Sequence, residues 1–350
     1  MLALLFHGID IFYDERSKDI LEKLDGRYDI KPYIVGTMGI TSLFDSGIEG
    51  VELLFKRPSI AISELKGFDS VLIVLKARSI ETARTFLGTI GDRADFNGEI
   101  LGIDIKTQSL FEVKRSFSDI KNYLISLGFN EAPIGKGIDV TKEKNYLVRK
   151  IQGCKSGELL LFNGLVVGKI FDKDVQIYVK DKKIERIQGV EIKKHGLEKI
   201  KEVDIFSLKV DSTDGFETRE PSKIRKIEGE YILFINHDAY SIYKNLSNIL
   251  GAVTVGDDTT RISGYILQRF GVPLIGIVDG DKDGVIKGEH FYKGSVLFEV
   301  EGDDITGDKI QSHFFKENNA IKHDFLRLKK DIENYLGEEI IRKIEYQNII

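Results

Sequence analysis

Short apolar runs alternate with stretches of helical period over roughly the first 130 residues. Each run has the length and apolar character of a buried strand, and the runs lie at 2–6, 33–35, 51–55, 71–75 and 100–105. Helices are predicted where apolar residues recur three or four positions apart, at 17–24, 81–90 and 118–128. Strands that alternate with helices are typical of an open α/β sheet with mostly parallel strands.

The hydrophobic pattern changes to a period of two beyond residue 144. The preceding segment, 130–144, is rich in glycine and charge and has no clear period, so we expect a domain boundary there. Asn163-Gly164 lies between two apolar runs, and this dipeptide is typical of a two-residue hairpin turn. Alternating runs at 175–179 and 184–190 predict further strands. This region is therefore predicted to be a small antiparallel β module.

Helical and strand periods interleave again from Gly229 onwards. Three strands are predicted, at 231–236, 252–255 and 273–278. Asp238 caps a predicted helix that extends to Ile249, and a second helix is predicted over 259–270. Because βαβ crossovers are right-handed, the three strands should be parallel, with their carboxyl ends at one edge of the sheet. Apolar residues spaced three and four apart over 321–335 predict a terminal helix.

These patterns predict an α/β protein of three parts, which fits a length of 350 residues. We expect an N-terminal open α/β domain, a central antiparallel β module and a C-terminal parallel α/β domain with terminal helices. Their predicted bounds are 1–135, 145–212 and 225–350. The composition, 42% hydrophobic and 31% charged, is that of a soluble globular protein.

Charge and cysteine content exclude several classes of function. The net charge of −5, from 51 basic and 56 acidic residues, argues against a uniformly basic nucleic-acid binder. Cys154 is the only cysteine, so the chain forms no internal disulfide and no thiolate zinc site, and we expect a reducing, cytoplasmic setting. No apolar run reaches the ~18 residues that span a bilayer, so no membrane partner is expected.

The strongest candidate chemistry is acidic and follows two neighbouring predicted strands. One strand is followed by Gly256-Asp257-Asp258-Thr259-Thr260, and the next by Asp279-Gly280-Asp281. Because carboxyl ends of adjacent parallel strands face one crevice, these carboxylates should converge. Mg²⁺, or Mn²⁺ in its place, prefers such oxygen ligands and is commonly shared with substrate phosphates. The predicted metal ligands are Asp257, Asp258, Asp279 and Asp281.

The same residues also predict a phosphate contact. Gly256 permits a tight chain reversal, and Thr259 and Thr260 offer hydroxyl and backbone N–H groups at a helix N-terminus, where anions bind favourably. The competing interpretation is structural, since aspartate and threonine commonly cap helices and Asp-Gly commonly forms turns. A second alternative is a calcium loop, because Asp279, Asp281, Asp283 and Gly284 match the opening of an EF-hand, although His290 stands where its bidentate glutamate belongs.

Residues 231–284 resemble the Toprim domain of primases, topoisomerases and related nucleases. Asp279 and Asp281 match its Asp-x-Asp metal motif, Gly284 matches the glycine that follows, and 251–260 resembles its middle strand and turn. Toprim enzymes carry a glutamate at the end of the first strand, which serves as acid–base or metal-binding carboxylate. This chain has Asn236-His237-Asp238 there, so the resemblance implies Asp238 as the candidate catalytic substitute beside Asp279 and Asp281.

Two further resemblances include the turn at 256–260, one confined to that turn and one that extends over the whole chain. Its sequence is similar to the Gly-Gly-Asp-Gly-Thr turn of a kinase group that includes phosphofructokinases, although two of those glycines are missing. The whole chain resembles an uncharacterised protein family of methanogenic archaea. That resemblance implies no activity, and it rests on three segments: 36–39, 194–199 and 256–260.

A second candidate phosphate site lies in the first predicted domain. Gly36-Thr37-Met38-Gly39 follows a strand and opens a predicted helix, so its backbone is a candidate cradle for phosphate, with His7-Gly8 lining the same crevice. The candidate cofactor-binding residues here are Gly36, Thr37 and Gly39. A purely structural turn is the competing interpretation.

Two classes of function remain open from the sequence. The first is Mg²⁺-dependent phosphoryl or nucleotidyl chemistry, with Asp279 and Asp281 as the central ligands. The second is a non-catalytic protein that binds a phosphorylated metabolite, a nucleotide or a nucleic acid and reports it to a partner. The clustered aspartates favour the first class, and the missing Toprim glutamate favours the second. The sequence does not predict the oligomeric state.

Overall fold

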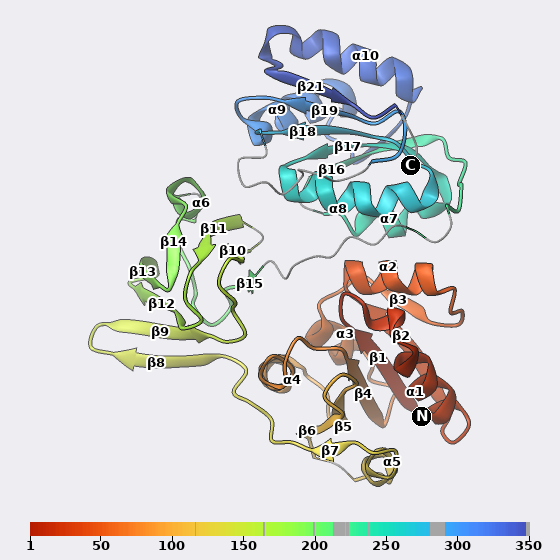
Figure 1. Cartoon of the computed structure of the whole chain (residues 1–350), viewed down its shortest axis with the longest axis vertical. Helices are drawn as coiled ribbons and strands as arrows, with labels where there is room; N and C mark the ends of the chain where they lie inside the picture. The colour runs from red at the N-terminus through yellow and green to blue at the C-terminus, as the bar shows by residue number, and fades with distance from the viewer. Residues whose placement is uncertain are drawn as a thin grey trace. The chain divides into compact units, whose positions relative to one another are not determined.

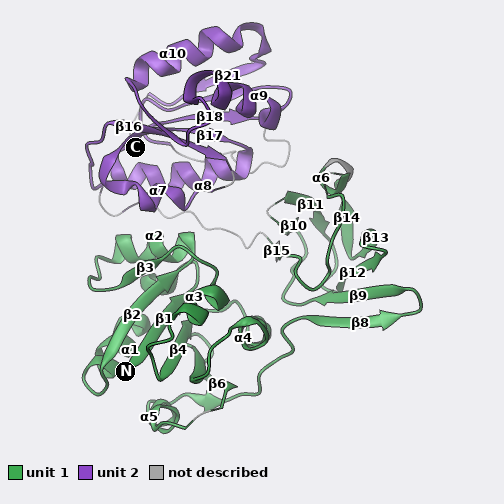
Figure 2. Cartoon of the chain, turned by 180° about the vertical axis from the view of Figure 1, so that it is seen from behind, with its two compact units in different colours: residues 1–217 green, residues 218–350 purple. Residues whose placement is uncertain are grey.

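A computed structural model describes residues 1–115, 117–163, 165–198, 200–212, 221, 224–236, 238–280 and 291–347. The chain forms two compact units, Met1–Glu217 and Thr218–Ile350 (Figure 2). The fold is mixed α/β, with parallel and antiparallel sheets and several helices (Figure 1). The predicted first domain and the predicted β module thus lie in one compact unit, and the predicted third domain lies in the other.

The first unit begins with a seven-stranded sheet in the order β3-β2-β1-β4-β5-β6-β7. Its strands are β1 (Leu2–His7), β2 (Ile30–Val35), β3 (Glu52–Leu54), β4 (Ser70–Leu75), β5 (Glu99–Asp104), β6 (Ser109–Lys114) and β7 (Asn130–Glu131). The first five are parallel, as predicted, and β6 is antiparallel to β5. β1 and β4 are almost entirely apolar because helices cover both of their faces.

The helices of this sheet divide between its two faces (Figure 1). They are α1 (Glu15–Asp25), α2 (Thr37–Ser46), α3 (Pro58–Glu64), α4 (Ile80–Arg93) and α5 (Ile120–Ser126), with a 3-10 turn η1 (Ile11–Tyr13) before α1. Apolar residues of α3 and α4, such as Ile62 and Leu87, share a core with Leu5, Val35 and Ile73. The alternate residues of the same strands face the opposite layer, as the contact between Phe6 and Phe12 shows.

The strand order reverses beside β1. From β1 the chain moves outward through β2 to β3, and it then returns to place β4 on the other side of β1. Ligands of open α/β sheets bind at such a reversal, in the crevice beyond the carboxyl ends of the strands. In this sheet that place is formed by the residues after His7, the last residue of β1, and after Leu75, the last residue of β4.

Two four-stranded antiparallel sheets, in the orders β14-β11-β10-β15 and β13-β12-β9-β8, complete the first unit. Their strands are β8 (Asp139–Glu143), β9 (Tyr146–Ile151), β10 (Leu159–Phe162), β11 (Leu165–Ile170), β12 (Val175–Lys180), β13 (Lys183–Gln188), β14 (Val190–Ile192) and β15 (Val210–Ser212); a short helix, α6 (Lys194–Glu198), follows β14. The predicted hairpin around Asn163 is confirmed, and Asn163 has a φ of 51°. Segment 130–144, which was predicted to be a domain boundary because it has no clear period, contains β7 and β8.

The chain passes from the seven-stranded sheet to the two antiparallel sheets across helix α4. A Cβ atom on Gly88 would lie 2.2 Å from the carbonyl oxygen of Gly135, and one on Gly137 would lie 2.3 Å from the backbone nitrogen of Thr89. The segment that leaves the first sheet therefore crosses α4 in backbone contact, which only glycines permit. A partly buried ion pair between Arg78 and Glu158, with 2.5 Å between the nitrogen and oxygen, adds a second link.

The second unit contains a six-stranded sheet in the order β20-β16-β17-β18-β19-β21. Its strands are β16 (Tyr231–Asn236), β17 (Ile249–Val255), β18 (Leu274–Val278), β19 (Val296–Glu299), β20 (Ala320–Lys322) and β21 (Arg342–Glu345). The four central strands are parallel, which confirms the predicted arrangement of the first three. β20 and β21 are antiparallel edge strands.

Helices cover both faces of this second sheet (Figure 1). They are α7 (Ser241–Lys244), α8 (Asp257–Leu267), α9 (Asp303–Ile310) and α10 (Phe325–Leu336), with short turns η2 (Leu246–Asn248), η3 (Gln268–Phe270), η4 (Gln311–Phe315) and η5 (Gly337–Glu339). One core packs Leu328 and Ile332 of α10 against Val253, Val255 and Ile275 of the sheet. On the opposite face, the Thr260 hydroxyl of α8 lies 2.8 Å from that of Thr254.

Two details of this unit differ from the sequence prediction. The helix expected from Asp238 to Ile249 is only the four residues of α7 and the turn η2, because Ile249 already begins β17. The predicted terminal helix is confirmed as α10, but β21 follows it and extends the sheet. None of the helices in the described parts of the chain is long and apolar enough to cross a membrane.

Candidate metal site

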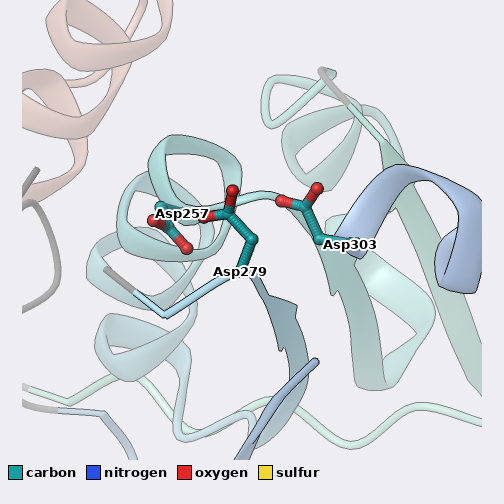
Figure 3. Close-up of side chains that lie close together, drawn as sticks. All are labelled: Asp257, Asp279 and Asp303. Carbon is teal, nitrogen blue, oxygen red and sulfur yellow. The ribbon is translucent and has the colours of Figure 1, made fainter. Parts of the chain in front are cut away.

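Three aspartates converge at the carboxyl edge of the second sheet (Figure 3). Asp257, Asp279 and Asp303 each offer a carboxylate oxygen, and these oxygens all lie within 4.8 Å of one another. All three side chains are partly buried. Each comes from the segment that follows one of three adjacent parallel strands, β17, β18 and β19. The cluster therefore results from the parallel topology, which brings residues distant in sequence to one edge.

Gly256 shapes the turn that presents Asp257. It has φ 93° and ψ 148°, a conformation that disfavours residues with a side chain, and it is the N-cap of α8. A Cβ atom at this position would lie 3.8 Å from Oδ2 of Asp303 and 3.8 Å from the hydroxyl of Thr259. The absence of a side chain thus keeps the space beside the cluster open.

Asp303 was not among the predicted ligands, although its sequence context resembles that of Asp257. Gly302-Asp303-Asp304 follows β19 and opens α9, just as Gly256-Asp257-Asp258 follows β17 and opens α8. Carboxylates in the first turn of a helix interact favourably with its N-terminal partial charge. The repeat of Gly-Asp-Asp after β17 and after β19 is therefore the sequence signal for Asp303, the third carboxylate of the cluster.

The other predicted residues of this turn lie in different surroundings. Asp258 is partly buried and is not a member of the three-carboxylate cluster. Thr259 is 6% exposed, with its hydroxyl close to Gly256. Thr260 is fully buried, and its hydroxyl bonds to that of Thr254 between helix and sheet, so the candidate phosphate contact falls to Thr259.

Two polar residues lie at the end of β16, next to β17. Asn236 pairs with Val255, and its Oδ1 atom is buried with no hydrogen-bond partner among the residues that the structure describes. Asp238 also has a buried Oδ1 atom without such a partner, and burial raises the pKa of its carboxyl group, opposed by the charge of Lys244. The structure does not include Asp238 in the carboxylate cluster.

Part of the predicted site lies outside the described residues. Asp281, the second aspartate of the Asp-x-Asp motif, belongs to 281–290, as do the remaining EF-hand positions Asp283, Gly284 and His290. Asp279 and Gly280 are described, and Gly280 has a φ of 101°. A Cβ atom on Gly280 would lie 2.9 Å from Oε1 of Glu299.

The second predicted phosphate site is built on a similar turn in the first unit. Gly36 is exposed, is the N-cap of α2 and has φ 90° and ψ 132°. Thr37 is the first residue of α2 and is partly buried. Gly39 is buried, and a Cβ atom there would lie 3.1 Å from the carbonyl oxygen of Gly8, so this glycine permits α2 to pack closely on the loop after β1.

The donor set at Asp257, Asp279 and Asp303 suits a hard divalent cation. Mg²⁺ and Mn²⁺ prefer carboxylate oxygens, whereas soft metals prefer thiolates. The lone thiol offers no alternative, because Cys154 is buried and desolvation raises its pKa to about 11. A divalent cation bound between them would reduce the mutual repulsion of the three carboxylates.

Comparisons with known proteins place the chain in a family. A crystal structure of an S-adenosylmethionine-dependent methyltransferase from Clostridium acetobutylicum aligns with 57% of this chain and 70% of its own, but its TM-score of 0.17 and 9% identity support no conclusion about fold or function. The chain is 29% identical to "Uncharacterized protein MJ0065" of Methanocaldococcus jannaschii over 326 residues, which are 87% of this chain and 89% of that protein. Neither comparison names a Toprim domain. Residues 4–318 match the family described as "Uncharacterized protein conserved in archaea (DUF2117)", and the chain belongs to that family.

Proposed function

We propose that Asp257, Asp279 and Asp303 hold Mg²⁺ or Mn²⁺, and that the protein is a cytoplasmic enzyme of phosphoryl or nucleotidyl chemistry. The observation that carries this proposal is the convergence of three carboxylate oxygens within 4.8 Å at the carboxyl edge of a parallel sheet. Asp281 follows Asp279 closely enough in sequence to contribute a further oxygen. The resemblance of 231–284 to Toprim domains supports the same chemistry, since their metal motif matches Asp279 and Asp281.

A bound divalent cation would supply charge neutralisation for a phosphate oxygen and a polarised water. The chain itself supplies the remaining parts. The first turn of α8 directs N–H groups toward the same edge, and Thr259 holds a hydroxyl near Gly256, where a phosphate group can approach the backbone. Asn236 offers a buried amide oxygen at the adjacent strand end, as an additional ligand or as a contact for the substrate.

Asp238 is the proposed proton-transfer group. Burial raises the pKa of its carboxyl group, and a raised pKa suits a general acid–base catalyst near neutral pH. It follows β16, whose neighbour β17 leads into the cluster. In this respect it would replace the glutamate that Toprim enzymes carry at the corresponding strand end, where this chain has Asn236.

The competing function is metal-dependent binding of a phosphorylated metabolite, a nucleotide or a nucleic acid without turnover. The observation in its favour is Asn236, an amide at the place of the Toprim glutamate. Activity assays with Mg²⁺ and Mn²⁺ distinguish the enzyme from the binding protein. They measure the release of phosphate or pyrophosphate from nucleotides and the cleavage of short nucleic acids. We expect turnover by the wild type and by Asp304→Asn, and at least about a hundredfold loss in Asp303→Asn.

Asp304→Asn is the matched control, because it removes one charge from the same turn of α9 but lies outside the cluster. Equal turnover by the two variants would contradict the proposed site. Metal-dependent substrate binding without turnover would instead establish the non-catalytic function.

A further inference from the structure

The two units contain the same local structure at a corresponding place. In the first unit, His7 pairs with Val35 at the ends of two parallel strands, and Gly36 follows with a φ of 90° as the N-cap of α2. In the second unit, Asn236 pairs with Val255, and Gly256 follows with a φ of 93° as the N-cap of α8. We call each of these a glycine cradle: the strand-end polar residue, the capping glycine and the first helical residue.

Both cradles also contain a buried polar atom that lacks a partner. Nδ1 of His7 and Oδ1 of Asn236 are buried, and neither has a hydrogen-bond partner among the residues that the structure describes. A buried polar atom left without a hydrogen bond costs free energy, so such atoms commonly mark the place of an absent ligand or water. Because both cradles have such an atom at the same position, we infer that the atom is part of a binding site in each.

The cradles differ in charge. The first turn of α8 carries Asp257 and Asp258, whereas the first turn of α2 carries no acidic residue. Residue 37, which corresponds to Asp257, is a threonine. The N-terminal partial charge of a ten-residue helix is therefore not offset by a carboxylate at α2.

The first cradle has the geometry to receive an anion. A Cβ atom on Gly36 would lie 3.6 Å from Nδ1 of His7 and 3.7 Å from its Cε1, so the glycine leaves open the space between the imidazole and the helix N-terminus. Gly36 itself is exposed, which gives access from solvent. His7 is held in place by stacking on Phe86, with 4.5 Å between the ring centroids and 2° between the ring planes.

We propose that the His7–Gly36–Thr37 cradle is a second binding site, which takes the phosphate group of a small molecule at the N-terminus of α2. Backbone N–H groups of the first helical turn donate to the phosphate oxygens, and Nδ1 of His7 donates one further hydrogen bond. The site lies beside β1, where the strand order of the sheet reverses. It is independent of the carboxylate cluster and needs no metal ion.

The neighbouring cation does not supply the attraction. Nζ of Lys76, which follows β4, lies 2.5 Å from a carboxylate oxygen of Asp10 and 3.5 Å from one of Asp14. The lysine is therefore neutralised by two carboxylates. The attraction for an anion comes from the backbone of α2, and a single charge placed in its first turn should decide whether phosphate binds.

Calorimetric titration with inorganic pyrophosphate, in metal-free buffer of fixed ionic strength, tests this proposal. Thr37→Asp places a carboxylate where Asp257 stands in the other cradle, at a helix position that favours acidic residues, so folding should be retained. We expect the affinity for pyrophosphate to fall at least about tenfold in Thr37→Asp and to stay within about twofold of wild type in Thr37→Ser.

Two further variants make the test specific to this cradle. His7→Phe keeps the stacking on Phe86 but removes Nδ1, and it should weaken pyrophosphate binding several-fold. Asp308→Asn removes an exposed charge from the second unit, outside the carboxylate cluster, and should leave pyrophosphate binding unchanged. Absence of binding to the wild type, equal binding by Thr37→Asp, or loss of binding in Asp308→Asn would each overturn the proposal.

Discussion

His7 shows how one partly buried side chain connects stability with a proposed site. Burial lowers the pKa of its imidazole to about 4, from an ordinary value of 6.5, while the nearby backbone of Val35 has a smaller, opposite effect on this pKa. The ring is therefore neutral at physiological pH. A neutral imidazole donates a hydrogen bond without adding charge, which agrees with a site whose attraction for anions comes from the backbone.

The lowered pKa predicts a specific dependence of stability on pH. Between pH 6.5 and about 4 the unfolded chain binds a proton at residue 7 and the folded chain does not, so acidification lowers the free energy of unfolding. The contribution is fully retained above pH 6.5, and up to about 3 kcal/mol is lost by pH 4. His7→Phe should lack this loss, as urea denaturation of both proteins across the pH range will show. Parallel pH profiles for the two would mean that His7 is not buried as described.

At the scale of residues, the sequence predicted two of the three clustered aspartates. Asp257 and Asp279 were predicted as ligands from their positions after adjacent strands, and the structure places them together. Asp303 was missed because β19 was not predicted, so nothing showed that its Gly-Asp-Asp turn lay at the same edge. The burial of Thr260 was also not predictable, because it depends on which face of α8 meets Thr254.

At the scale of elements, most strands buried on both faces were predicted, and β19 is the exception. Their continuous apolar runs, as in β1, β4 and β18, distinguish them from half-buried strands. Four edge strands, β7, β8, β20 and β21, were missed because their exposed residues break the apolar pattern. The helix expected after Asp238 was wrong because its apolar residues at 246–249 serve a turn and the start of β17.

The contact of α4 with the segment at 135–137 provides a test at this scale. Gly88→Ala would place a methyl group 2.2 Å from the Gly135 carbonyl oxygen, so we expect a loss of roughly 1–3 kcal/mol in the free energy of unfolding. Gly91→Ala is the control in the same helix, since its methyl group would meet only the side chain of Val113 within 3.5 Å, and helix propensity favours alanine. Chemical denaturation measures both. Equal stabilities would mean that α4 and this segment are not in backbone contact.

At the scale of the whole molecule, two compact units each combine a parallel sheet with a glycine cradle at its carboxyl edge. The family match, residues 4–318, extends over both units, so the two belong together in this family. The two cradles differ in charge: three carboxylates lie beside the cradle of the second unit, whereas the first turn of α2 in the first unit has no acidic residue and no side-chain cap hydrogen bond. If the second unit binds a cation and the first binds a phosphate group, as proposed, the pair would suit phosphoryl chemistry or its regulation.

Direct binding of Mn²⁺, followed by the loss of its free-ion electron paramagnetic resonance signal, tests the metal site most directly. We predict a single site in the wild type, abolished in Asp279→Asn with Asp303→Asn. Asp304→Asn with Asp308→Asn also removes two negative charges, both from α9 and both outside the cluster, and this variant should bind Mn²⁺ within about twofold of wild type. Mn²⁺ binding that survives in the cluster variant, or that is lost equally in both, would contradict the assignment of Asp257, Asp279 and Asp303 as a metal site.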